Sequence, residues 1–256
     1  ELRLNTDGHI IKFGADNDIN ITHVADTGLT TNGTFQATTI TATTAVVPDA
    51  SDGAALGTTA LEWSDLFLAD GAVINFGDDQ DVSLTHVADT GLVLKHTATA
   101  DDKPINLILQ TGETDMAAND VIGKISFQAP DEGTGTDAIL ISAAIQARAE
   151  GDYSSSSNAT SLDFMTGASE AAAKKMSLTS AGHLLPASDD AQDLGSGSLQ
   201  WRDIYTGDLN LNNTKHRKNE VDGTSGSWTI QEGSEDLFLL NRLSGKKYKF
   251  NLTEVK

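Results

Sequence analysis

The stretch FGDDQDVSLTHVADTGL, residues 76–92, repeats a segment that the chain has already used, FGADNDINITHVADTGL, residues 13–29. The two copies lie 63 residues apart, and twelve of their seventeen positions are identical. The five differences mostly keep the size and polarity of the side chain. A duplication of this kind indicates a repeated structural unit, and it argues against a single catalytic globule.

Within each copy the hydrophobic pattern has a period of two, which is typical of a half-buried β-strand. Ile19 and Ile21 share a face with His23, and Val82, Leu84 and His86 repeat this arrangement. Gly and Asp residues on both sides favour tight turns. Each copy therefore predicts a short β-meander, which has too few apolar residues to form a core alone and must be completed by neighbours.

The composition is unusual for a globular protein of 256 residues, since aromatic residues make up 5% and cysteine is absent. The 23 glycines far outnumber the 4 prolines. Small side chains suit thin, strand-rich layers better than a thick core, so we expect an elongated oligomer. Without cysteine, neither a disulfide framework nor a thiolate metal site can form.

The net charge of −20 is distributed unevenly along the chain. Residues 1–208 hold 9 basic and 31 acidic side chains, whereas residues 209–256 hold 8 and 6. An acidic body repels nucleic acid and anionic membranes, so we expect neither as a partner. No apolar run approaches the roughly 20 residues of a membrane span. The chain starts at Glu1 without a Met, which fits a processed or truncated N-terminus.

A second repeat family pairs residues 48–70 with residues 186–208 at a constant offset of 138. The matched positions include Leu-Gly pairs, several Asp residues and Trp63 with Trp201. Each copy predicts a small cluster centred on its Trp. We interpret these Trp side chains as packing residues, with sugar stacking as the alternative.

Further strands are expected in the second half of the chain. Residues 105–109 form one strand candidate, and several short alternating runs in residues 121–185 predict a β knob. Residues 170–175 have helical propensity but are too few for an independent helix. The end of the chain predicts a β-meander tip with strands at 228–231, 237–241 and 247–252. The expected divisions are thus 1–47, 48–120, 121–185, 186–213 and 214–256.

Several of these segments resemble tail-fibre and other virion-fibre proteins of tailed bacteriophages, particularly marine ones. The resemblance is carried by the duplicated unit, by VIGKISF through KKMSLTSAGH, by LGSGSLQWRDIYTGDLNL and by the tip sequence NEVDGTSGSWTIQEGSEDLFLLNRLSGKKYKF. It covers about four fifths of the chain.

The resemblance implies a structural virion fibre, a tail fibre above all, that is mainly β, elongated and an intertwined homotrimer of shaft segments and small knobs. It implies attachment to the host surface without catalysis, cofactor or metal. The implied partners are copies of the chain, other virion or tail proteins and a host-surface glycan or protein receptor. A polysaccharide-depolymerising tail spike and a self-assembling extracellular filament subunit remain the alternatives.

Three kinds of residue were weighed as sites within the repeats. The Asp-Thr-Gly triplets at 26–28 and 89–91 match aspartic peptidase loops, but their context favours a structural turn. The acidic turns around Asp16 and Asp79 lack the spacing of an EF-hand, which favours a solvated turn over a Ca²⁺ site. His23 and His86 suit a hydrogen-bonded packing role better than a metal site shared between chains.

The tip holds the candidate receptor-contact residues. Lysines 246, 247 and 249 cluster beside Tyr248, so this near-neutral end is expected to approach phosphate- or carboxylate-bearing glycans. Trp228 joins them as core or as platform, with core favoured by its alternation with Ile230. In the alternative interpretation, residues 214–256 only cap the trimer or dock it to another virion protein. The receptor-contact candidates are Lys246, Lys247, Tyr248, Lys249 and Trp228.

Overall fold

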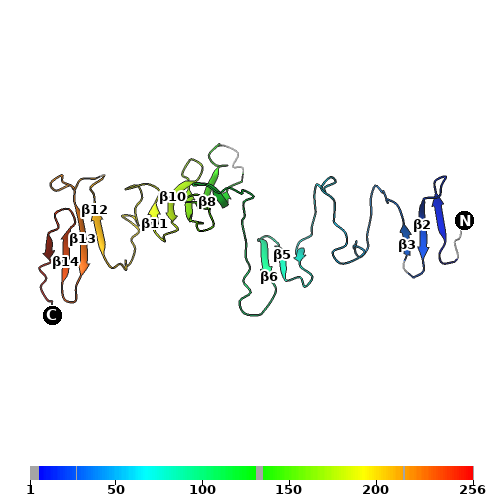
Figure 1. Cartoon of the computed structure of the whole chain (residues 1–256), viewed down its shortest axis with the longest axis horizontal. Helices are drawn as coiled ribbons and strands as arrows, with labels where there is room; N and C mark the ends of the chain where they lie inside the picture. The colour runs from blue at the N-terminus through cyan, green and yellow to red at the C-terminus, as the bar shows by residue number, and fades with distance from the viewer. Residues whose placement is uncertain (1–5, 27, 131–134, 216, 256) are drawn as a thin grey trace. The chain divides into compact units, whose positions relative to one another are not determined.

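The computed structural model describes residues 6–26, 28–130, 135–215 and 217–255. Within these ranges all regular structure is β-strand, in four antiparallel sheets, and no helix occurs (Figure 1). The mainly-β fold class is therefore confirmed. The chain divides into two units, residues 1–99 and residues 100–256, which are described separately.

The first unit contains two three-stranded sheets that arise from the duplicated sequence. They run in the orders β1-β2-β3 and β4-β5-β6, and Phe13 lies opposite Ile19 just as Phe76 lies opposite Val82. The two copies thus fold into the same meander with the same register. Their strands are β1 (Ile10–Phe13), β2 (Ile19–Val24), β3 (Gly28–Thr31), β4 (Val73–Phe76), β5 (Val82–Val87) and β6 (Gly91–His96).

Each of these sheets has one apolar face, because residues opposite each other across the strands share a side. Ile11 lies opposite Ile21, and Ile74 lies opposite Leu84. None of these four side chains is buried, and among the described strands none from another sheet packs extensively on the face they form. The expected alternation of Ile19, Ile21 and His23 against their polar neighbours is confirmed by the register.

The second unit begins with a five-stranded sheet in the order β11-β10-β9-β8-β7. One face carries Ile125, Ile145, Phe164 and Met176 in a single row across four strands. The expected knob strands are therefore present. They are β7 (Val121–Gln128), β8 (Ile141–Ala149), β9 (Thr160–Thr166), β10 (Ala173–Leu178) and β11 (Leu184–Pro186).

The other face of this sheet is held by polar contacts. The Arg148 Nε donates a hydrogen bond to the Asp163 Oδ2 at 2.7 Å, and its Nη1 donates to the Asn119 Oδ1 at 3.0 Å. Asp163 is 2% exposed, and its charge is matched by the guanidinium. The sheet thus separates apolar and polar side chains between its two faces.

The C-terminal sheet has four strands in the order β12-β13-β14-β15. The three expected tip strands are found, but β15 ends at Lys249, earlier than the predicted Leu252. The sheet also takes its first strand from residues 209–212, which the sequence assigned to the junction. The strands are β12 (Leu209–Asn212), β13 (Ser227–Glu232), β14 (Leu237–Asn241) and β15 (Lys247–Lys249).

Residues 105–109 were expected to form a strand and do not, because no neighbouring strand pairs with them in the described chain. Leu109 instead packs on Gly123, where an added Cβ would come within 2.8 Å of the Leu109 Cβ. The Thr-rich residues 34–47 and the Trp-containing segment 48–70 likewise hold no strand, and the segment 186–208 holds none after Pro186, the last residue of β11. Residues 170–175 form no helix, and β10 starts at Ala173.

Few hydrophobic side chains are buried. Among the described residues, the buried ones are Ala144 and Ala149, both small and both on β8. Fully buried side chains are mostly polar, such as Thr229 and Asp163. The apolar side chains that period two places on one face of each sheet are therefore left at the surface of the single chain.

Candidate binding surface of the C-terminal sheet

The strand pairing divides the C-terminal sheet into two chemically different faces. One row across the strands contains Leu209, Ile230, Leu239 and Tyr248, and this side is called the apolar face below. The adjacent row contains Asn210, Thr229, Leu240 and Lys247, and this side is called the polar face.

Trp228 and Tyr248 lie on the apolar face and contact each other. Their ring centroids are 5.8 Å apart with planes tilted by 42°, a favourable geometry for an aromatic pair. The Trp228 ring also lies over Gly226, where an added Cβ would come within 2.8 Å of the indole Nε1. Trp228 is half-buried, whereas Tyr248 is 46% exposed. The pair therefore packs the sheet and still presents an aromatic edge to solvent.

The lysines of the predicted contact surface lie elsewhere. Lys247 and Lys249 are on the polar face, where the Lys249 Nζ lies 2.8 Å from the Asp236 Oδ1. Lys246 precedes β15, and its backbone carbonyl accepts a hydrogen bond from the Asn241 N–H. The structure thus brings Trp228 to Tyr248 but places this pair and the two strand lysines on opposite faces, because neighbours in a strand alternate.

A buried hydroxyl fixes the polar face. The Thr229 Oγ1 donates to the Asn210 Oδ1 at 2.7 Å and accepts from the Arg242 Nε at 2.8 Å. Thr229 is fully buried, so both roles of its hydroxyl are satisfied without water. These bonds hold β12, β13 and the turn after β14 together.

The polar face carries a groove of about 350 Å³ that the sequence pattern did not predict. Two polar residues of the groove are hydrogen-bonded to each other: the Gln231 Nε2 donates to the Asp208 Oδ2 at 2.7 Å. Phe238 lies directly opposite Gln231 in the sheet. The alternation within β14 predicts that Phe238 and Leu240 share a face. It does not predict that Gln231 lies beside Phe238, because that depends on the register of β13 with β14. The lining residues are Asp208, Gln231, Glu232, Phe238, Leu240 and Lys247.

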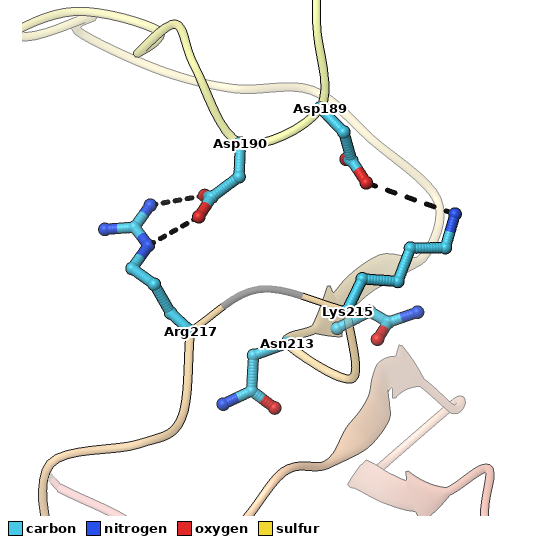
Figure 2. Close-up of a pocket in the computed structure, with 6 residues that line it drawn as sticks. Asp189, Asp190, Asn213, Lys215 and Arg217 are labelled. Carbon is cyan, nitrogen blue, oxygen red and sulfur yellow. Dashed lines mark hydrogen bonds and ion pairs between the residues drawn. The ribbon is translucent and has the colours of Figure 1, made fainter.

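Ion pairs join the Trp-containing segment 186–208 to the loop between β12 and β13 (Figure 2). The Arg217 Nε donates to the Asp190 Oδ2 at 2.8 Å, and its Nη2 donates to the other carboxylate oxygen at 2.5 Å. The Lys215 Nζ lies 4.0 Å from the Asp189 Oδ2. The Asp190 hydrogen bonds and charge raise the pKa of Arg217. The two acids and two bases neutralise each other, so this pocket holds the loop and offers no excess charge to a ligand.

The acidic turns of the duplicated unit bring carboxylates close to the glycine that begins each turn. An added Cβ on Gly14 would meet the Asp18 Oδ1 at 2.9 Å and the Asp16 Oδ1 at 3.1 Å. Gly77 has the corresponding relation to Asp81, at 2.8 Å. Both glycines have a positive φ, and the carboxylates fold over them. No group of three His, Cys, Asp or Glu side chains in the described part of the chain is arranged to hold a metal ion.

The two repeat histidines have corresponding acidic neighbours. The His23 Nδ1 lies 3.5 Å from the Asp7 Oδ1, and the His86 Nδ1 lies 3.6 Å from the Asp70 Oδ1. Each His thus faces one carboxylate that precedes its repeat at the same separation along the chain. The packing role and the metal site shared between chains both stay predictions of the sequence.

Asp26 and Asp89 lie in the turns between the second and third strands of each meander, and Gly28 and Gly91 begin the third strands. Asp26 and Asp89 both have φ values near +58°, at 59° and 57°. In the second copy the Thr90 N–H donates to the Val87 carbonyl at 3.0 Å, which closes the turn. Thr27 lies outside the described residues. These turn geometries support a structural role for both Asp side chains.

No family model, curated protein or solved structure matches this chain. The described residues contain no helix of the length and apolar character needed to cross a membrane.

Proposed function

We propose that the chain is the subunit of a virion fibre, most specifically a tail fibre, which assembles as a homotrimer and carries a host-contact surface at its C-terminal sheet. The observation that carries this proposal is that one face of every sheet in the single chain presents exposed apolar side chains. The family resemblance supplies the number of copies and the setting on a virion.

The apolar faces favour assembly because their side chains cost free energy while they face water. Burying a Leu, Ile or Phe side chain completely stabilises a protein by about 1.5–3 kcal/mol. Phe13 and Phe76 hold corresponding places in their sheets and are 49% and 50% exposed. Equal exposure in both repeats supports one mode of assembly used twice.

The Trp-containing segments support the same proposal independently. They have no strand of their own, and their matched apolar side chains have nearly the same exposure in the two copies. Trp63 and Trp201 are 68% and 62% exposed, and Phe67 and Tyr205 are both 93% exposed. A segment without a ladder or a core keeps a defined fold only when other chains cover these side chains.

The local fold of these segments is also the same. Gly57 and Gly195 have φ values of +87° and +89°, and at each an added Cβ would lie 3.0 Å from the carbonyl oxygen four residues later. The Thr58 N–H donates to the Leu61 carbonyl, as the Ser196 N–H donates to the Leu199 carbonyl. Two turns of the same geometry that present matched apolar side chains suit contact points between parallel copies.

Charge supports the division between body and contact end. Residues 1–208 carry a net −22, which keeps neighbouring fibres apart, and residues 209–256 carry a net +2. A near-neutral end approaches a bacterial surface more closely than the body does. The polar face of the C-terminal sheet also stays open to solvent if the apolar face is used for assembly.

Light scattering and cell adsorption test the proposal. A trimer has a mass of about 81 kDa, three times the 26.9 kDa of the chain, and a stable monomer would refute the assembly. Deletion of residues 209–256 removes the whole C-terminal sheet, whereas a deletion from 214 would leave β12 unpaired. We expect this shortened chain to remain trimeric and to lose adsorption to host cells.

Two further measurements address the alternatives. Release of oligosaccharides from host surface polysaccharide would identify a depolymerase spike. Electron microscopy that shows filaments of unlimited length, in place of particles of one length, would identify a filament subunit.

A further inference from the structure

The groove on the polar face lies where three strands and the residue before β12 meet. Gln231 lies opposite Phe238 across the β13–β14 pair, and Leu240 lies opposite Lys247 across the β14–β15 pair. Asp208 closes one side through its bond from Gln231. Because the groove is built on paired strands, the register fixes where its strand residues lie relative to one another.

The groove offers both hydrogen-bond donors and acceptors. The Gln231 amide gives one N–H to Asp208, which leaves its carbonyl and its second N–H available. In the described residues the Lys247 ammonium and the Glu232 carboxylate form no hydrogen bond or ion pair with any other side chain. Hydroxyl groups both donate and accept, so a polyhydroxylated ligand matches this lining.

The groove also offers an apolar surface next to these polar groups. Phe238 is 36% exposed, and Leu240 beside it is partly buried. A saccharide ring has a C–H face and a rim of hydroxyl groups. The Phe238 ring can stack on the C–H face of the sugar. The amide, carboxylates and ammonium of the groove can form hydrogen bonds with its hydroxyl groups.

Charge decides between classes of saccharide. Asp208 and Lys247 contribute one charge of each sign to the groove. Glu232 adds a further negative charge at its border, where β13 ends, although its row with Leu237 belongs to the apolar face. Lys249 does not change this sum, because Asp236 already neutralises it. A carboxylate- or phosphate-bearing sugar would face net repulsion here, whereas a neutral sugar would not.

We infer that the groove lined by Asp208, Gln231, Phe238 and Lys247 binds a neutral saccharide. This inference deepens the proposed function and rests on it for the biological source of the sugar, the host surface. It replaces the anionic glycan that the lysine cluster of the sequence favoured. Lys247 acts as a hydrogen-bond donor to hydroxyl groups in this site.

The test uses the full chain and a panel of glucose, galactose, N-acetylglucosamine and glucuronic acid, with binding followed by ligand-observed NMR. We expect at least one neutral sugar to bind and glucuronic acid to bind more weakly. Gln231→Ala removes hydrogen bonds to the sugar and is expected to weaken binding by about tenfold. Phe238→Leu keeps an apolar side chain in the strand but removes the ring, and it should weaken binding similarly.

Lys249→Gln is the matched control, because Lys249 lies on the same face and strand as Lys247 but is engaged by Asp236. It should leave sugar binding unchanged, and circular dichroism should show the same melting for all variants. Preference for glucuronic acid, or equal losses in Gln231→Ala and Lys249→Gln, would overturn the groove assignment. So would the absence of neutral-sugar binding at 10 mM or so, a limit that covers the weak single-site range of affinities.

The outcomes separate this inference from the proposed function. If the chain is trimeric and adsorbs to cells but binds no neutral sugar, the fibre proposal stands and the groove assignment falls. If it binds the sugar through Gln231 but is monomeric and does not adsorb, the groove stands and the fibre proposal falls.

Discussion

Ile10 and Ile11 are neighbours in β1 that lie on opposite faces of its sheet. Ile11 belongs to the apolar side with Ile21, whereas Ile10 lies opposite Thr22 on the other side. Their exposed fractions are similar, 49% for Ile10 and 40% for Ile11. Replacing each by Ala in turn therefore compares the two faces at nearly constant chemistry and position.

The expected difference follows from the area that association would cover. Ile→Ala removes about three carbon groups, each worth about 0.8 kcal/mol on full burial. Ile11 is 40% exposed in the single chain, so about that share of its burial is gained when chains associate. Ile11→Ala should therefore weaken association by about 1 kcal/mol per chain, or about 3 kcal/mol per trimer. The dissociation constant of the trimer should rise about 150-fold for Ile11→Ala. Ile10→Ala should change it little, since its loss is confined to the single chain.

Sedimentation equilibrium over a dilution series measures this difference directly. Both variants lose similar β-propensity, so an effect of strand stability would appear equally in each. Equal weakening by Ile10→Ala and Ile11→Ala would refute the assignment of the apolar face to assembly. A mass of 26.9 kDa for the unmodified chain at every concentration would do so more directly.

Two further predictions concern the five-stranded sheet. Asp163→Ala leaves Arg148 without its nearly buried partner. We therefore expect the free energy of opening at β8 and β9, measured by hydrogen exchange, to fall by about 3 kcal/mol. The double variant Arg148→Met with Asp163→Leu should restore most of this free energy. The Ser180 hydroxyl and N–H lower the pKa of Glu150 below its ordinary value of 4.5, so this stabilisation is present above pH 4.5 and is lost as pH falls through the lower, folded-state pKa. Glu150→Gln should remove that acid-dependent step from the Ser180 amide shift in an NMR titration, and an unchanged step would contradict the assignment.

The alternation of apolar and polar residues in the sequence was sufficient to predict most of the strands. It also predicts which side chains of a strand share a face. The tip strand predicted at 237–241 matches β14 residue for residue. The short strand β12 was missed because Leu209–Asn212 offers only two alternating leucines directly after a segment without strands. The strand predicted at residues 105–109 was wrong for the opposite reason. Their apolar pattern is strong, but no strand of the described chain pairs with them.

The candidate site was harder to predict because it depends on how strands are paired. A run of adjacent residues such as 246–249 attracts attention through charge, but alternation places Tyr248 away from Lys247 and Lys249. That part could have been anticipated from period two alone. The groove could not, since Gln231 and Phe238 become neighbours only through the register of β13 with β14.

Alternation also explains how one short sheet can serve two purposes. A shift of register by one residue would exchange the two faces of the C-terminal sheet and put Thr229 on the apolar side. The bonds from Thr229 to Asn210 and from Arg242 to Thr229 oppose such a shift, because the buried Thr229 hydroxyl would lose both of its hydrogen-bond partners. The same buried hydroxyl that stabilises the sheet therefore keeps Trp228 on the face assigned to assembly and Gln231 on the face assigned to the ligand. The sheets of this chain bury few apolar side chains, so apolar packing contributes little to their register. Buried hydrogen bonds such as those of Thr229 therefore fix the register and keep the two faces distinct.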